Sequence, residues 1–388
     1  MTGPIVRLPR ADGTVGEHRL GRPGDFTRPD GPLTSRTAYA AAHVVADPFG
    51  DNTPGAPVDV DWEATLAFRR HLWSYGLGVA DAMDTAQRGM GMPWSTTAEL
   101  IRRSAAEAQA CGGLLACGAG TDQAPAELAS TEEVLAAYLE QIEVIEGAGA
   151  TVIIMASRQL ARVARSPEDY AKVYGRLLEQ VSRPVVLHWL GPMFDPALAG
   201  YWGSAQLTEA TDTVLQVIAD HSAKVDGIKV SMLDEAHEVD MRRRLPDGVR
   251  LYTGDDFNYP TLVRGDGESY SHALLGIFDA IAPAASTALQ ALDRGDLATY
   301  DRLLEPTVAL SRHLFGTPTY YYKTGIVFLA WLAGHQRGFR MVGGLESSRS
   351  PQHLAEVFRL ADAAGLLPDP ELAASRMRTY LQTVGVDQ

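Results

Sequence analysis

The chain has 388 residues, of which 46% are hydrophobic and 21% are charged, a composition typical of a globular protein with a large core. Its 34 Lys and Arg and 48 Asp and Glu residues give a formal net charge of -14, which argues against nucleic acid or an anionic membrane as a partner. There is no run of eighteen apolar residues and no signal-peptide pattern, so we expect neither a membrane span nor export. Because Cys111 and Cys117 are predicted to lie too far apart for a disulfide, we expect a cytoplasmic protein.

Residues 1–36 are rich in glycine, proline, arginine and aspartate, which predicts an irregular N-terminal arm. From residue 37 onward, short apolar segments alternate with segments that carry apolar residues at helical spacing. The strand-like segments are 39–46, 79–83, 113–117, 151–155, 184–188, 225–231, 249–253 and 272–278. The helical segments between them include 62–74, 95–110, 131–146 and 235–244. This alternation predicts a parallel sheet.

Eight strand–helix units fit a (β/α)8 TIM barrel, which typically takes about 250 residues. We therefore predict an α/β fold in which residues 37–283 form the barrel and its catalytic domain. The remaining residues, 284–388, keep helical apolar spacing and predict a C-terminal helical extension. Its helices are predicted at 284–292, 296–315, 323–333, 351–364 and 372–383.

The strand predicted at 225–231, Val-Asp-Gly-Ile-Lys-Val-Ser, carries a lysine near its carboxyl end. Because side chains alternate across a strand, Lys229 and Ser231 lie on the face opposite to Ile228 and Val230. If the apolar face packs on helices, Lys229 points into the barrel. Burial there lowers the pKa of the amine and makes it a nucleophile that can form a Schiff base. The alternative is a strand-end lysine that extends to solvent.

Active sites of TIM barrels lie at the carboxyl ends of the strands, and six consecutive predicted strands end in polar residues. These residues are Asp84, Thr85, Thr121, Asp122, Ser157, Arg158, His188, Lys229, Ser231, Asp255 and Asp256. Alone, His188 fits a core histidine bonded to backbone, but beside Lys229 on the next strand it is a candidate for proton transfer. Asp255 and Asp256 could orient the site, hold a sugar hydroxyl, cap the following helix or ligate a metal.

The order of these segments resembles the dihydrodipicolinate synthase/N-acetylneuraminate lyase superfamily of class I aldolases. Segment 226–229, Asp-Gly-Ile-Lys, is similar to that family's Schiff-base lysine strand, and segment 253–256, Thr-Gly-Asp-Asp, to its Gly-Asp-Asp turn. Segment 184–188 is similar to the strand that usually ends in the catalytic tyrosine. The resemblance covers about residues 39–338 and suggests a divergent branch, of the kind labelled a domain of unknown function. It implies a TIM-barrel lyase without cofactor or metal that forms a homodimer or homotetramer.

The sequence departs from the family pattern at two places. His188 stands where the family has its tyrosine, and an imidazole has an ordinary pKa nearer neutrality. Segment 83–87, Met-Asp-Thr-Ala-Gln, corresponds to the Gly-Thr-Thr-Gly-Glu loop whose threonine pair holds the substrate carboxylate, and it retains only Thr85 of that pair. Asp84 would repel a carboxylate at short range, although Arg88 could compensate for it. We therefore hypothesise a keto-sugar or other polyol ketone as substrate rather than pyruvate.

The first functional hypothesis is a Schiff-base-forming lyase, an aldolase or dehydratase of carbohydrate metabolism, whose partner is a small keto substrate. It assigns catalysis to Lys229, His188 and Thr85, and substrate binding to Asp84, Arg88, Ser231, Asp255 and Asp256.

The second hypothesis is a divalent-metal-dependent sugar isomerase or epimerase on the same barrel. Its metal ligands would be His188, Asp255 and Asp256, with His43 or Asp84. No closely spaced ligand motif such as His-Glu-x-x-His supports it. The third hypothesis is a barrel that only binds a small molecule, and the convergent polar strand ends argue against it.

Overall fold

The computed structural model describes residues 3–388, and their packing divides the chain into two compact units. The first, termed the barrel unit, comprises residues 36–42 and 78–276. The second, termed the helical unit, comprises the described residues up to 35 together with 43–77 and 277–388. The limits of these units differ from the domain boundaries predicted at residues 36 and 283, since residues 43–77 belong to the helical unit. The division into three domains remains a prediction.

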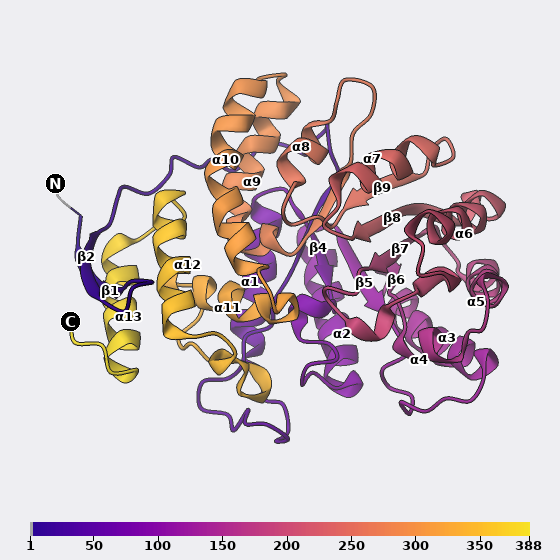
Figure 1. Cartoon of the computed structure of the whole chain (residues 1–388), viewed down its shortest axis with the longest axis horizontal. Coiled ribbons are helices and arrows are strands. Elements are labelled where there is room, and N and C mark those ends of the chain that lie inside the picture. Colours follow the sequence, from indigo (N-terminus) through magenta and orange to yellow (C-terminus); the bar gives the residue numbers. More distant parts are fainter. Residues whose placement is uncertain (1–2) are drawn as a thin grey trace. The chain divides into compact units, whose positions relative to one another are not determined.

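Within the barrel unit, parallel strands close on themselves in the order β10-β3-β4-β5-β6-β7-β8-β9. These strands are β3 (Ala38–Ala41), β4 (Gly78–Asp81), β5 (Leu115–Ala119), β6 (Thr151–Ile154), β7 (Val185–Leu190), β8 (Val225–Ser231), β9 (Arg250–Thr253) and β10 (His272–Leu275). The helices of this unit are α2 (Trp94–Cys111), α3 (Thr131–Gly147), α4 (Arg158–Val163), α5 (Pro167–Gln180), α6 (Leu207–Asp220), α7 (Glu235–Arg244) and α8 (Tyr259–Arg264). The predicted TIM barrel is therefore confirmed, and Figure 1 shows α3, α5 and α6 outside the strands.

The inside of the barrel is filled by side chains of very different sizes. The small residues Ala41, Ala80 and Ala116 share one buried cluster with the larger Tyr252 and Leu274. This mixture allows eight strands to close around a solid core rather than a pore. Because side chains alternate along each strand, the cluster also fixes which residues point inward at the carboxyl ends.

The barrel unit buries an acidic side chain, Glu238 on α7. Its two carboxyl oxygens accept hydrogen bonds from Thr253 Oγ1 (2.9 Å) and Ser271 Oγ (2.7 Å). Burial raises the pKa of Glu238 from its ordinary value to about 8. The folded protein therefore holds a proton that the unfolded chain releases between the two pKa values, so this group makes stability fall as the pH rises through that range.

We expect the Glu238→Gln variant to lose less stability than the wild type between about pH 5 and pH 8, because glutamine does not ionise. Urea unfolding at several pH values measures this difference. The matched control is Glu235→Gln, which changes an exposed glutamate on the same helix. Parallel stability curves for the wild type and Glu238→Gln would contradict the raised pKa.

The helical unit combines a β-hairpin with helices. Its helices are α1 (Trp62–Ser74), α9 (Ile277–Asp293), α10 (Leu297–Leu314), α11 (Tyr322–Leu332), α12 (Pro351–Ala363) and α13 (Pro370–Thr383). The predicted C-terminal helices are thus confirmed. Between residues 3 and 388, no helix has both the length and the hydrophobicity that crossing a bilayer requires.

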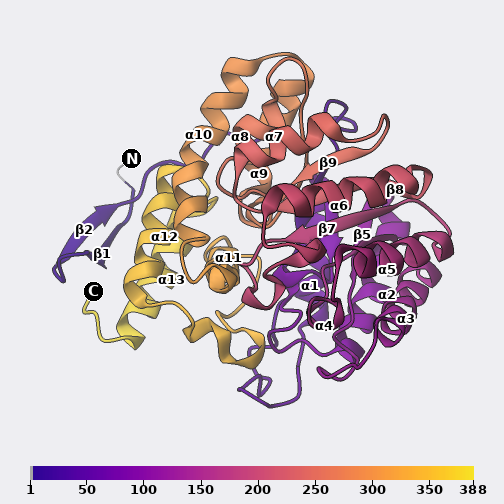
Figure 2. The same ribbon diagram turned by 45° about the vertical axis from the view of Figure 1, so that its right-hand side comes forward.

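The N-terminal arm was predicted to be irregular, but part of it is regular, because β1 (Ile5–Pro9) and β2 (Val15–Arg19) form an antiparallel hairpin. Val6 and Leu8 are buried, whereas Arg7 between them is exposed, which is the alternation of a half-buried strand. The carbonyl oxygen of Ile5 accepts a hydrogen bond from Arg378 Nη2 at 2.6 Å. Figure 2 shows the hairpin beside α12 and α13, both of which contact β1. The glycine- and arginine-rich composition concealed this short strand pair.

Candidate active site

The pairing of β7 with β8 brings His188 and Lys229 side by side, since the two are direct partners in the parallel register. Val186, two residues before His188, belongs to the cluster inside the barrel, so His188 points to the same side. A Cβ atom on Gly227, two residues before Lys229, would meet the ring of Tyr252, another member of that cluster. Both candidate catalytic side chains therefore point into the barrel.

Lys229 is buried, with 7% of its surface exposed. Burial lowers the pKa of its amine below the ordinary value, while the carboxylates of Asp256 and Asp84 partly oppose this effect. A larger fraction of this amine is therefore unprotonated near neutral pH than in an exposed lysine. The unprotonated amine is the form that attacks a carbonyl carbon.

Gly254, directly after β9, leaves the space that the Lys229 side chain occupies. A Cβ atom on Gly254 would lie 2.8 Å from Lys229 Cε and closer still to Ser231 Oγ. The backbone N–H of Gly254 donates to Val230 O at 2.8 Å, which fixes the turn against β8. The glycine of the Gly-Asp-Asp segment is thus explained by the position of the lysine.

We expect Gly254→Ala to lower the free energy of unfolding by about 1–3 kcal/mol, because the added methyl group overpacks this contact. The same change should displace Lys229 and reduce its reaction with ketones. Urea unfolding and borohydride trapping measure the two effects. Gly147→Ala serves as control, since a Cβ atom there meets nothing within 4 Å. A Gly254→Ala protein with wild-type stability and wild-type trapping would contradict this account.

His188 is a neutral imidazole held in the barrel interior. Burial, and then the charge of Lys229, lowers the pKa of His188 well below its ordinary value. The pKa of His188 is thus lower than the ordinary imidazole value on which the sequence comparison with tyrosine relied. His188 Nε2 lies 3.3 Å from Ser231 Oγ, and Nδ1 has no hydrogen-bond partner among the residues that the structure describes. This side chain is not the backbone-bonded core histidine that formed the alternative interpretation.

The two aspartates of the Gly-Asp-Asp segment differ in their surroundings. Asp255 Oδ1 accepts hydrogen bonds from the backbone N–H groups of Phe257 (2.8 Å) and Asn258 (3.0 Å), and Oδ2 accepts one from Asn258 Nδ2 (2.9 Å). Asp255 therefore organises the turn that leads into α8. Asp256 is buried and acts electrostatically on Lys229, which makes it the aspartate of the pair that influences the amine.

The segment after β4 supplies Asp84 and Thr85, which lie in the short 3-10 helix η1 (Asp84–Ala86). Asp84 is half-buried and contributes to the electrostatic environment of Lys229. Thr85 is buried.

The guanidinium group of Arg88 is bonded to acceptors within the protein. Nη1 donates to the carbonyl oxygen of Gly118 at 2.6 Å, and Nη2 donates to Gln141 Oε1 at 2.6 Å. The same group forms an ion pair with Asp122. This arrangement braces the wall of the pocket and leaves little capacity for a substrate carboxylate, which the sequence had allowed Arg88 to bind.

A pocket of about 80 Å³ lies over the carboxyl ends of β4 to β7. Of the predicted site residues, Asp84, Arg88 and His188 line it. The others, namely Lys229, Ser231, Thr85, Asp255 and Asp256, are buried and are not part of its lining. Because His188 is the register partner of Lys229, the pocket reaches the neighbour of the proposed nucleophile.

The pocket also contains polar groups to which the sequence gave no role. Thr121 Oγ1 lies 2.6 Å from Ser157 Oγ and donates to Gln159 Oε1 at 2.7 Å. Arg158 and Asp195, which also line the pocket, form an ion pair with each other. Thr121, Ser157 and Arg158 were visible as polar strand ends, but Gln159 and Asp195 follow their strands by several residues and had no comparable signal.

The structure gives no support to the metal-dependent alternative. Among residues 3–388, no group of three or more His, Cys, Asp or Glu side chains is arranged to hold a metal ion. His43, one of the proposed ligands, bonds to Asp279 in the helical unit, with 2.8 Å between Nδ1 and Oδ2. Asp255 is engaged in its own turn.

Comparison with known families decides the classification. The sequence matches the family model described as "Protein of unknown function (DUF993)" over residues 6–386. The chain belongs to the DUF993 family. No curated protein matches the sequence of this DUF993 chain.

Solved structures similar to the DUF993 chain are dihydrodipicolinate synthases and their relatives. The synthase from Aquifex aeolicus has a TM-score of 0.62 and 13% identity, covering 86% of this chain and 99% of its own. The synthase from Thermotoga maritima has a TM-score of 0.63 and 16% identity, covering 85% and 100%. YagE, a prophage protein of that family from E. coli K12 in complex with pyruvate, has a TM-score of 0.63 and 14% identity, covering 90% and 99%. These findings confirm the predicted resemblance at the level of the fold and of a family without a described function.

Proposed function

We propose that this protein is a Schiff-base-forming lyase, either an aldolase or a dehydratase, in which Lys229 is the nucleophile. The observation that carries the proposal is the buried amine of Lys229, whose pKa is lowered by burial, on the inner face of the barrel. Its register partner is the neutral imidazole of His188. The fold shared with dihydrodipicolinate synthases agrees with this chemistry.

In the proposed reaction, the unprotonated Lys229 amine adds to the carbonyl carbon of the substrate. The resulting carbinolamine takes up a proton and loses water, which leaves an iminium ion. An aldolase then removes the proton of the hydroxyl group on the β-carbon, so that an aldehyde leaves, the electron pair of the broken C–C bond forms an enamine double bond, and the C=N π pair moves to the nitrogen. The enamine takes up a proton at its α-carbon and becomes an imine again. A dehydratase instead removes a proton from the α-carbon, after which the β-hydroxyl leaves as water. Hydrolysis of the imine restores the lysine.

His188 is the proposed base for the proton that must be removed. A neutral imidazole has one nitrogen that is able to accept a proton. Thr85 and Ser231 are proposed to assist by hydrogen bonding, and Asp256 by stabilising the cationic intermediates.

The charges around the pocket favour a keto-sugar as substrate over a 2-keto acid. Asp84 would repel a carboxylate, and the two guanidinium groups of the lining are already paired, Arg88 with Asp122 and Arg158 with Asp195. Carboxylates accept hydrogen bonds from hydroxyl groups, which suits a polyol. The pyruvate bound to YagE makes 2-keto acids the alternative that must be tested.

Borohydride trapping tests the proposal directly. The protein is incubated with fructose, dihydroxyacetone or pyruvate, reduced, and examined by intact mass and peptide mapping. We expect a covalent adduct on Lys229 with a keto-sugar and none in Lys229→Arg. The matched control is Lys224→Arg, which changes the half-buried lysine just before the same strand. No adduct with any ketone would overturn the lyase assignment, and an adduct with pyruvate alone would overturn the substrate class.

A further inference from the structure

The helical unit contains a cavity of about 280 Å³ that the proposed reaction does not use. Helices α1, α9 and α11 contribute to it, together with the segments around residues 23–26 and 365–368. A cavity of about 150 Å³ is enough to hold benzene, so this space suits a molecule of one substituted ring or two fused rings.

Hydrogen bonds join the two segments that close the cavity to each other and join the first of them to α9. Gly24 N–H donates to Gly365 O at 2.8 Å, and Thr27 N–H donates to Thr287 Oγ1 at 2.9 Å. Gly365 has a φ of +69°, and a Cβ atom there would lie 2.7 Å from Gly24 N. Because these contacts are made by the protein itself, the cavity is preformed rather than opened by a ligand.

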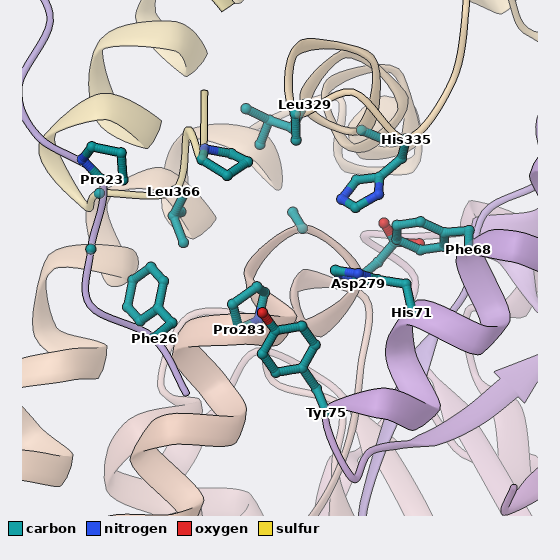
Figure 3. A pocket seen from close by; sticks show the side chains of 16 residues that line it. Pro23, Phe26, Phe68, His71, Tyr75, Asp279, Pro283, Leu329, His335 and Leu366 are labelled. Atoms are coloured by element: carbon teal, nitrogen blue, oxygen red, sulfur yellow. The ribbon is translucent and has the colours of Figure 1, made fainter. Parts of the chain in front are cut away.

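The cavity has an apolar side and a polar side, as Figure 3 shows. Pro23, Phe26 and Leu366 lie on one side, and His71 and His335 lie across from them. An amphipathic lining of this kind fits a ligand that is flat and apolar at one end and polar at the other.

The polar side presents imidazole groups with unused hydrogen-bonding capacity. The rings of His71 and His335 have centroids 4.3 Å apart, and Phe68 packs against both. Burial lowers the pKa of His71 to about 3 and that of His335 to about 4, so both rings are neutral near pH 7. In the described part of the chain, no protein group bonds to their ring nitrogens. Each neutral ring offers one donor and one acceptor, which a hydroxyl group can satisfy.

The acidic group of the lining is already engaged. Asp279 accepts hydrogen bonds from the backbone N–H of His43 (2.8 Å) and from His43 Nδ1 (2.8 Å). An anionic ligand would be repelled by this carboxylate. A cation would lose its hydration to reach a carboxylate that already accepts hydrogen bonds from His43. A neutral ligand avoids both costs.

We propose that this cavity is a second binding site, which takes a small neutral phenol-like molecule whose ring lies against Phe26 and Leu366 and whose hydroxyl group bonds to His71 and His335. This site is independent of Lys229 and of the lyase reaction.

Isothermal titration of the full chain with 4-methylphenol tests the proposal. The comparison ligand is 1,4-dimethylbenzene, which has the same shape but no hydroxyl group. We expect saturable binding of 4-methylphenol at one site, at least about tenfold tighter than that of the comparison ligand. The charged analogues 4-methylbenzoate and 4-methylbenzylamine should bind more weakly than 4-methylphenol.

Variants locate the binding. Ala280→Leu places a larger side chain in the lining and should abolish binding, while His335→Phe keeps the ring packing and should weaken it about tenfold. Lys229→Met should leave it unchanged. The proposal is overturned if no ligand saturates, if a charged analogue binds most tightly, or if His335→Phe binds like the wild type. Because His335→Phe preserves shape, it decides the matter even if Ala280→Leu does not fold.

Discussion

Lys229→Met is expected to reduce turnover by at least about 10³-fold, on the scale observed when a covalent nucleophile is removed. Methionine retains the length and volume of the buried stem but has no amine to form an imine. The measurement is kcat/KM with whichever ketone is trapped by borohydride, together with the melting temperature of the variant. A folded Lys229→Met protein with more than a few per cent of wild-type activity would exclude the Schiff-base mechanism.

The control for this variant is Lys224→Met, on the amino-terminal side of the same strand. Lys224 Nζ donates a hydrogen bond to Val181 O at 2.7 Å, so its removal costs a local contact but no chemistry. We expect Lys224→Met to keep the wild-type kcat/KM. Equal losses in the two variants would indicate that the strand, rather than the Lys229 amine, is required.

The lowered pKa of Lys229 predicts the direction in which kcat/KM changes with pH. Since burial lowers the pKa of the amine, kcat/KM should rise with pH and reach its plateau below the ordinary lysine value of 10.5. Asp256 raises the pKa of Lys229, so Asp256→Asn should shift the rising limb of the profile to lower pH. A shift to higher pH, or none, would show that Asp256 does not act on the amine.

The parts of the fold that the sequence predicted well are those with strong local periodicity. The strand predicted at 225–231 and the helix predicted at 62–74 coincide with β8 and α1, because alternation and helical spacing are properties of the segment itself. The predicted strand 39–46 ends earlier, at Ala41, where the chain passes from the barrel unit to the helical unit. Apolar residues continue beyond that point, so periodicity alone could not place the end.

The parts of the site that the sequence did not reveal depend on partners far away in the chain. The sequence allowed Arg88 to bind a substrate. Its acceptor Gln141 lies 53 positions further along the chain, so the sequence did not reveal that this guanidinium is already bonded. The pKa of His188 depends on burial and on Lys229, neither of which a single strand displays. For Asp255, the sequence left helix capping among several roles, but the N-cap of α8 is Asn258, and Asp255 instead accepts hydrogen bonds in the turn before that helix.

His188→Phe is expected to lower kcat by about 10²- to 10⁴-fold, the range attributed to a positioned acid–base group. Borohydride trapping at Lys229 should persist in this variant, because imine formation needs the amine rather than the base for the later step. Single-turnover kinetics and intact mass measure the two steps separately. The control is His237→Phe, since His237 packs on Trp189, which points to the other side of β7. Loss of trapping together with turnover would contradict this division of roles.

The stability of His188→Phe distinguishes a functional histidine from a structural one. His188 Nδ1 is buried without a partner within the described residues, and the Nε2 contact with Ser231 is long, at 3.3 Å. Removing an unsatisfied buried polar atom while keeping a ring of similar shape should leave the free energy of unfolding equal or higher. A histidine needed for packing would instead lower stability when replaced. A variant that is as stable as the wild type, forms the imine and fails to turn over would therefore show that this barrel keeps His188 for proton transfer.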